Sequence, residues 1–90
     1  MFKTLEELIA IIRQRKISSA EKSYTKKLLN DKKLSIEKVK EEIAELIDAI
    51  EKNTNKVHEA ADILYHLMVF LEANDIKIED VMDELKKRQK

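Results

Sequence analysis

The sequence predicts an all-α protein of four to five helices that form an antiparallel bundle. The 90 residues include no glycine and no proline, the residues that hairpin turns and strand ends usually need. Apolar residues recur three and four positions apart along most of the chain, which is the spacing of a helical face. Turns are left to asparagine and aspartate, which tolerate the left-handed backbone conformation. Helices joined by short polar turns follow from these three observations.

The first third of the chain is expected to hold a longer and a shorter helix. Thr4 and Glu7 fit a capping box, with Thr4 as the N-cap, and the apolar positions that follow predict a helix over residues 5–13. A basic cluster at its end suits the negative end of the helix dipole and consists of Arg13, Arg15 and Lys16. Residues 17–33 are expected to be a loop that contains a short helix over residues 24–29.

The rest of the chain predicts a helical hairpin and one further helix. Ser35 is the expected N-cap of a helix that runs to about Lys52. Its expected buried stripe consists of Ile36, Val39, Ile43, Leu46, Ile47 and Ile50. A turn over residues 52–56 joins it to a helix over residues 57–71, which is apolar on almost every face, as an internal helix is. A last amphipathic helix is expected over residues 79–87.

Length and composition limit the classes of function. Ninety residues make a single domain, expected to span 1–90, and a chain this small with an internal helix predicts a homodimer or a higher homo-oligomer. Lysine and arginine number 18 against 18 aspartates and glutamates, so we expect no binding to nucleic acid or membranes. The absence of cysteine excludes a thiolate metal site and fits a cytoplasmic protein. The N-terminal apolar run is too short for a signal peptide or a membrane span.

Acidic residues gather on the two helices of the expected hairpin. Glu41, Glu42 and Glu45 lie three and four positions apart, a spacing at which like charges destabilise a helix. Glu59 and Asp62 lie in the apolar helix that follows, where a carboxylate either pairs with a cation or loses its charge. Glu45 and Asp62 are each about eight residues from the turn, or roughly 12 Å along the hairpin. The sequence therefore predicts that four carboxylates, those of Glu42, Glu45, Glu59 and Asp62, converge.

The chemistry of such a cluster is limited by its ligands. Oxygen ligands alone select Mg²⁺, Mn²⁺ or Ca²⁺ over zinc or copper, and Mg²⁺ keeps coordination positions for phosphate oxygens, which indicates phosphoanhydride hydrolysis. In the alternative interpretation, Lys38 and Lys40 or water neutralise the acids, and the protein is a non-catalytic helical dimer. A di-iron bundle is disfavoured because neither His58 nor His66 has glutamate three residues before it. His66 either touches a ligand or is hydrogen-bonded in the core.

These acidic motifs resemble those of a known superfamily. Glu41-Glu42-x-x-Glu45 followed by Glu59-x-x-Asp62 is similar to the EExxE and ExxD pair of the MazG-like all-α nucleoside triphosphate pyrophosphohydrolases. Four segments resemble the phosphoribosyl-ATP pyrophosphohydrolases more narrowly: residues 15–25 with Ser23-Tyr24-Thr25, residues 38–42, residues 59–66 and residues 79–88. The likeness thus covers nearly the whole chain. Lys40 departs from the family, which often has glycine there.

The resemblance implies the second step of histidine biosynthesis, the Mg²⁺-dependent cleavage of phosphoribosyl-ATP to phosphoribosyl-AMP and pyrophosphate, in a helical homodimer. Mn²⁺ is the expected substitute ion, and another nucleoside triphosphate is the alternative substrate. The implied metal ligands are Glu42, Glu45, Glu59 and Asp62, and the implied catalytic acids are Glu41, Glu42 and Glu45, with Glu41 as a further ligand or a base. The residues implied in substrate binding are Arg15, Ser23, Tyr24, Lys38 and His66.

Overall fold

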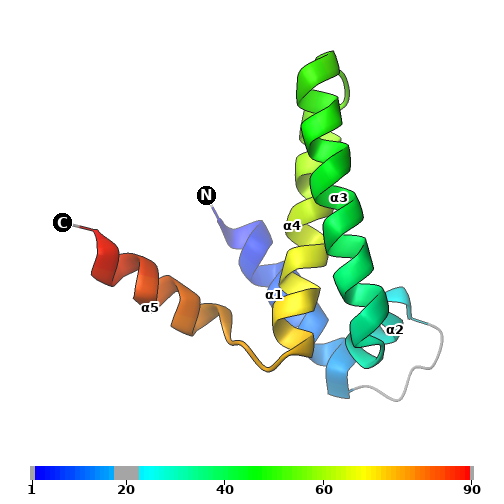
Figure 1. Ribbon diagram of the computed structural model, residues 1–90. Helices are drawn as coiled ribbons and strands as arrows, with labels where there is room; N and C mark the ends of the chain where they lie inside the picture. The colour runs from blue at the N-terminus through cyan, green and yellow to red at the C-terminus, as the bar shows by residue number, and fades with distance from the viewer. Residues whose placement is uncertain (1, 18–22, 90) are drawn as a thin grey trace.

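The computed structural model consists of five helices, without a strand in the residues that it describes, 2–17 and 23–89. The helices are α1 (Lys3–Ile17), α2 (Tyr24–Asn30), α3 (Lys32–Lys52), α4 (Lys56–Ala73) and α5 (Ile78–Arg88). In Figure 1, α3 and α4 form a long antiparallel hairpin, α1 and α2 lie near its base, and α5 extends away from it. The all-α prediction is confirmed. Residues 18–22 of the expected loop lie outside the described part.

The tight turns use asparagine and aspartate in the left-handed conformation, as predicted. Asn53 ends α3 with φ 56°, and its backbone N–H donates to the carbonyl groups of Ala49 and Ile50. Asn55 precedes α4 with φ 46°, and Asp75 adopts φ 58° in the connection to α5. These residue types accept a positive φ more readily than other non-glycine residues. The hairpin therefore forms without glycine.

Two predicted N-caps are wrong. Asp31 caps α3, because its Oδ1 accepts a hydrogen bond from the Leu34 N–H at 3.0 Å, and Ser35 lies buried inside the helix. Thr4 also lies inside a helix, since α1 begins at Lys3. Aspartate and serine cap equally well, so the position at which α2 ends decides between Asp31 and Ser35.

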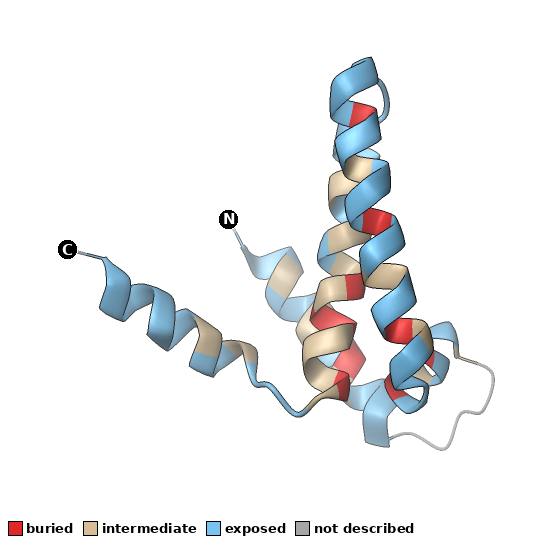
Figure 2. Cartoon of the chain, in the orientation of Figure 1, coloured by how far each residue is buried: buried red, intermediate tan, exposed pale blue. Residues whose placement is uncertain are grey.

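The hydrophobic core lies at the base of the hairpin. Its buried members come from α1, α2 and α4 and are Ile12, Leu28, Leu29, Met68, Val69 and Ala73. Figure 2 shows the buried residues of α4 gathered toward this end, whereas α5 has no buried residue. None of the described helices is both long and apolar enough to cross a bilayer.

The stripe of α3 that was expected to be buried is exposed over most of its length within one chain. Ile36, Ile43, Ile47 and Ile50 expose 41%, 46%, 53% and 57% of their surface. The residues of α3 that are buried instead recur every seven positions and are Ser35, Glu42 and Ala49. The isoleucines follow one flank of the helix, beside the line of buried residues. Leu64 is also 48% exposed, so a single chain does not cover every face of its helix, and the prediction that a second copy covers it stays a prediction.

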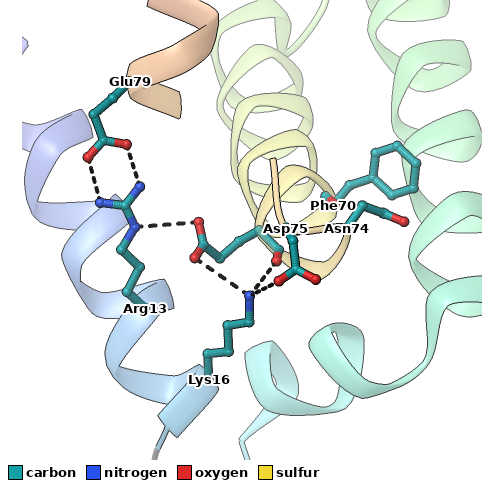
Figure 3. A network of polar contacts seen from close by, with 7 residues as sticks. Arg13, Lys16, Phe70, Asn74, Asp75 and Glu79 are labelled. Carbon is teal, nitrogen blue, oxygen red and sulfur yellow. Dashed lines mark hydrogen bonds and ion pairs between the residues drawn. The ribbon is translucent and has the colours of Figure 1, made fainter. Parts of the chain in front are cut away.

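A network of ion pairs joins α1 to the junction of α4 and α5 (Figure 3). Arg13 donates two hydrogen bonds to the Glu79 carboxylate, at 2.8 and 2.6 Å, and a third to Glu72. Lys16 donates to Asp75 Oδ1 and to the Glu72 carbonyl, both at 2.8 Å. The hydrogen bonds from Arg13 lower the pKa of Glu79 to about 2, and Lys16 lowers the pKa of Asp75. The helix α1 thus continues past its predicted end at Arg13 to Ile17, and Lys16 in the added turn takes part in the network.

Candidate active site

Carboxylates from both helices of the hairpin come together along its length. One oxygen from each of Glu42 and Glu45 on α3 and Glu59 on α4 lies within 4.8 Å of the other two. Glu59 belongs to a second group of the same dimension, with Asp62 and His58. We call Glu42, Glu45, Glu59 and Asp62 the carboxylate cluster. The structure thus brings the predicted acids together, with Glu59 linking Asp62 to the two glutamates of α3.

Two oxygens of the carboxylate cluster are buried without a hydrogen-bond partner among the described residues. They are Oε2 of Glu42 and Oε2 of Glu59, and the Glu42 residue is only 8% exposed. Buried polar atoms almost always have a partner, so each of these oxygens requires an explanation. The donors of the cluster are hard oxygen atoms without sulfur, a set that fits Mg²⁺ or Mn²⁺.

The electrostatics of the carboxylate cluster show the cost of bringing these acids together. Burial raises the pKa of Glu42, and the neighbouring Glu45 raises it further. Burial also raises the pKa of Glu59, to which the negative charges of Glu45 and Asp62 add. A divalent cation would remove the repulsion that these shifts reflect.

Lys38 and Glu41 form an ion pair beside the cluster. Lys38 Nζ lies 3.3 Å from Glu41 Oε2, and this hydrogen bond raises the pKa of Lys38. Of the three acids of α3 that the alternative interpretation pairs with Lys38 and Lys40, Glu41 is thus neutralised by Lys38, whose charge also acts on Glu42. The role of Glu41 as a base or a further ligand stays a prediction.

His66 lies on the side of α4 that faces α2 and is buried, with 8% of its surface exposed. Its Nδ1 donates to the backbone carbonyl of Asp62 at 2.9 Å, and its Nε2 lies 3.0 Å from the Tyr24 hydroxyl. Nδ1 is also 3.9 Å from Glu42 Oε1. Of the two interpretations of His66, the structure matches the hydrogen-bonded core residue.

The remaining predicted substrate residues occupy different surroundings. Ser23 is the N-cap of α2, where its Oγ accepts from the Lys26 backbone N–H at 3.3 Å. Tyr24 is 47% exposed next to the cluster, and the charges of Lys38, Glu41 and Glu42 act on its hydroxyl. Arg15 is exposed on α1 and belongs to neither carboxylate group.

Sequence reasoning missed two contacts beside the site. His58 Nε2 lies 3.3 Å from Asp62 Oδ2, a pairing that the four-residue spacing could have revealed. Thr25 and Tyr65 share a hydrogen bond through their hydroxyl groups. No local pattern indicates this second pair, because the two residues are 40 positions apart.

The all-α fold and the carboxylate cluster fit the class that the motifs resemble, the MazG-like all-α pyrophosphohydrolases. The family model for phosphoribosyl-ATP pyrophosphohydrolase matches residues 5–89, and the chain belongs to this family. The resemblance seen in the sequence is thereby confirmed.

Three relatives show how far the similarity extends. The phosphoribosyl-ATP pyrophosphatase of Methanocella arvoryzae is 40% identical, over the full length of both chains. That of Clostridium novyi is 42% identical over 96% of this chain and 81% of its own. The histidine biosynthesis bifunctional protein HisIE of Pyrococcus furiosus is 45% identical over 96% of this chain, which spans only 41% of that relative.

Proposed function

We propose that this protein cleaves phosphoribosyl-ATP to phosphoribosyl-AMP and pyrophosphate, the second step of histidine biosynthesis, with Mg²⁺ or, as a substitute, Mn²⁺. Membership of the family supports the reaction. The observation that carries the proposal is the pair of buried carboxylate oxygens without partners, on Glu42 and Glu59. A relative whose name states this activity matches the whole chain at 40% identity. The cytoplasm as the place of the reaction stays an expectation of the sequence.

The carboxylate cluster would hold the cation through Glu42, Glu45, Glu59 and Asp62. A bound Mg²⁺ supplies charge neutralisation for a polyphosphate and lowers the pKa of a water molecule. Glu41 precedes Glu42 on α3, and its carboxylate would accept the proton of the attacking water. The bond that breaks joins the α- and β-phosphoryl groups of the nucleotide.

Binding of the nucleotide falls to the polar groups beside the cluster. The Lys38 ammonium pairs with Glu41 and offers positive charge to phosphate oxygens. Tyr24 offers its partly exposed ring and hydroxyl beside His66, which lies 3.9 Å from Glu42. Ser23 precedes it as the N-cap of α2. Arg15, exposed on α1, stays a predicted contact to a phosphate or the ribose.

The proposal includes a homodimer that covers the exposed flank of α3. Four isoleucines at positions 36, 43, 47 and 50 lie on this flank, 41–57% exposed. Apolar surface left in water forgoes about 25 cal/mol per Å², and a chain of 90 residues has little stability to lose. Ile47→Glu should convert the dimer to a monomer in sedimentation equilibrium. Ile17→Glu, at the exposed end of α1, is the matched control.

A turnover assay tests the reaction. The purified protein is incubated with phosphoribosyl-ATP and Mg²⁺, and pyrophosphate release is measured beside a panel of ordinary ribo- and deoxyribonucleoside triphosphates. We expect cleavage of phosphoribosyl-ATP and poor turnover of the others. Preference for another triphosphate would keep the chemistry and change the substrate. No release from any nucleotide would leave the non-catalytic helical dimer.

A further inference from the structure

Two hydrogen bonds attach the start of α2 to the middle of α4. The Tyr24 hydroxyl bonds His66 Nε2 at 3.0 Å, and the Thr25 hydroxyl bonds that of Tyr65. Consecutive residues of one helix thus contact consecutive residues of the other, and we call these two bonds the α2–α4 latch. With seven residues, α2 is too short to be stable alone, so its position depends on such contacts.

The first bond of the latch has a defined direction. His66 Nδ1 donates to the Asp62 carbonyl, and an imidazole that carries its proton on Nδ1 has Nε2 as its acceptor. Burial raises the pKa of the Tyr24 hydroxyl, which therefore keeps its proton and donates to Nε2. His66 is 8% exposed whereas Tyr24 is 47% exposed, so the tyrosine is the member of this pair that a ligand can reach.

The latch places the Tyr24 ring at the edge of the carboxylate cluster. The Tyr24 hydroxyl bonds Nε2 of His66, and Nδ1 of the same ring lies 3.9 Å from Glu42 Oε1, so one imidazole ring separates Tyr24 from the cluster. The Tyr65 ring lies near it, with centroids 6.4 Å apart and planes 17° apart. The Tyr65 hydroxyl is fixed in turn by Thr25. A nucleotide whose phosphates meet the cluster would pass next to the Tyr24 ring.

We propose that His66, Tyr65 and Thr25 are positioning residues, which hold Tyr24 against the carboxylate cluster so that Tyr24 contacts the bound nucleotide. This proposal rests on the proposed function. In this proposal, His66 does not contact the nucleotide and affects its binding only by holding Tyr24.

A double-mutant cycle on Tyr24 and His66 tests this assignment. Tyr24→Phe and His66→Leu each remove the same hydrogen bond, so each should raise KM for phosphoribosyl-ATP by about tenfold, the factor that 1.4 kcal/mol gives. The double variant should be no worse than either single variant, with kcat within about twofold of wild type. Additive losses would show that His66 contacts the substrate itself and would overturn the proposal.

His66→Gln separates positioning from mere stability. The glutamine amide oxygen can accept from the Tyr24 hydroxyl, so this variant should restore most of the KM lost in His66→Leu. Circular dichroism and melting temperature are measured for each variant. A KM that follows the melting temperature, rather than the presence of an acceptor, would also overturn the proposal.

The second bond supplies an independent test with nearly isosteric changes. Thr25→Val and Tyr65→Phe should each raise KM by a smaller factor, about threefold, and the pair should again be non-additive. Unchanged KM in both single variants would remove Thr25 and Tyr65 from the assignment.

Calorimetric binding of phosphoribosyl-ATP distinguishes failure of this proposal from failure of the proposed function. If wild type binds this nucleotide without cleaving it, the proposed function fails, and the same cycles measured in Kd still decide the role of the latch. If wild type does not bind it at all, both proposals fail.

Discussion

The carboxylate cluster and the ion-pair network of α1 both depend on aspartate and glutamate side chains, but they use these acids in opposite ways. In the cluster, Glu42 and Glu59 face other acids, and both have raised pKa values. In the network, Glu79 faces Arg13, and its pKa falls to about 2. Acids matched by bases hold helices together, whereas acids that face one another keep oxygen atoms free for a ligand. A shifted pKa thus indicates a functional site only where its cause is burial or a like charge, and a structural contact where its cause is an ion pair.

The two regions also differ in what they do to folding. The network joins α1 to the α4–α5 junction, where α5 itself has no buried residue to hold it. Without a cation the cluster should oppose folding, because burial and repulsion raise the pKa values of Glu42 and Glu59 in the folded state alone. Changes to the cluster should therefore affect function and metal response, and changes to the network should affect stability.

The largest effect is expected from a charge removed within the cluster. Asp62→Asn should lower turnover of phosphoribosyl-ATP by about a hundredfold or more, the usual size for one group that stabilises transition-state charge, with helicity unchanged. Asp48→Asn is the matched control, an exposed acid of α3 that pairs with Lys52. Pyrophosphate release is the measurement, and retained activity would remove Asp62 from the site.

Cation binding should then separate the two regions by stability. At a Mg²⁺ or Mn²⁺ concentration 100 times its Kd, the folded state gains about 2.7 kcal/mol, or roughly 15 °C in melting temperature for a domain of this size. Glu42→Gln should lose most of this increment, because it removes a charged ligand of the cluster. Arg13→Gln should keep it. A melting temperature indifferent to these ions would favour the helical dimer without catalysis.

The outcome of sequence reasoning follows the same division between local and distant interactions. The absence of glycine and proline predicted the all-α fold, and counting from the turn predicted that acids of the two hairpin helices meet, although the structure groups Glu45 with Glu59 rather than level with Asp62. These inferences needed only helical geometry and a short connection. They succeeded because both helices of the hairpin are adjacent in sequence.

The errors arose where burial or a side chain's partner depends on residues far away in the sequence, or on what covers the chain. Periodicity found the apolar flank of α3 but could not tell whether the chain itself covers it, and Ile47 proves 53% exposed. Arg13 was assigned to a helix dipole, whereas its partner Glu79 is 66 positions away. The hydrogen bond between Thr25 and Tyr65 likewise joins separate helices. No local pattern encodes such pairs.

Breaking the network should give a moderate loss of stability without a loss of function. Arg13→Gln removes the paired hydrogen bonds to Glu79, both at the surface, so we expect a melting temperature about 5 °C lower with turnover unchanged. Arg88→Gln is the control, since Arg88 pairs only within α5, with Glu84. Differential scanning calorimetry measures both. A larger effect of Arg88→Gln would contradict the role given to the network.

The smallest effect is a pH dependence of opposite sign in the two regions. The lowered pKa of Glu79 gives stability above pH 4.5 that is lost as pH falls toward about 2. The raised pKa of Glu42 does the reverse, with stability present below pH 4.5 and lost as pH rises through its folded-state value. In metal-free urea unfolding, Glu42→Gln should therefore gain on wild type between pH 4.5 and 7, by a few tenths of a kcal/mol. The deficit of Arg13→Gln should shrink as pH falls from 4.5 toward about 2, because Glu79 becomes protonated in the unfolded state while it stays charged in the folded wild type. Parallel pH profiles for the two variants would contradict the contrast between the cluster and the network.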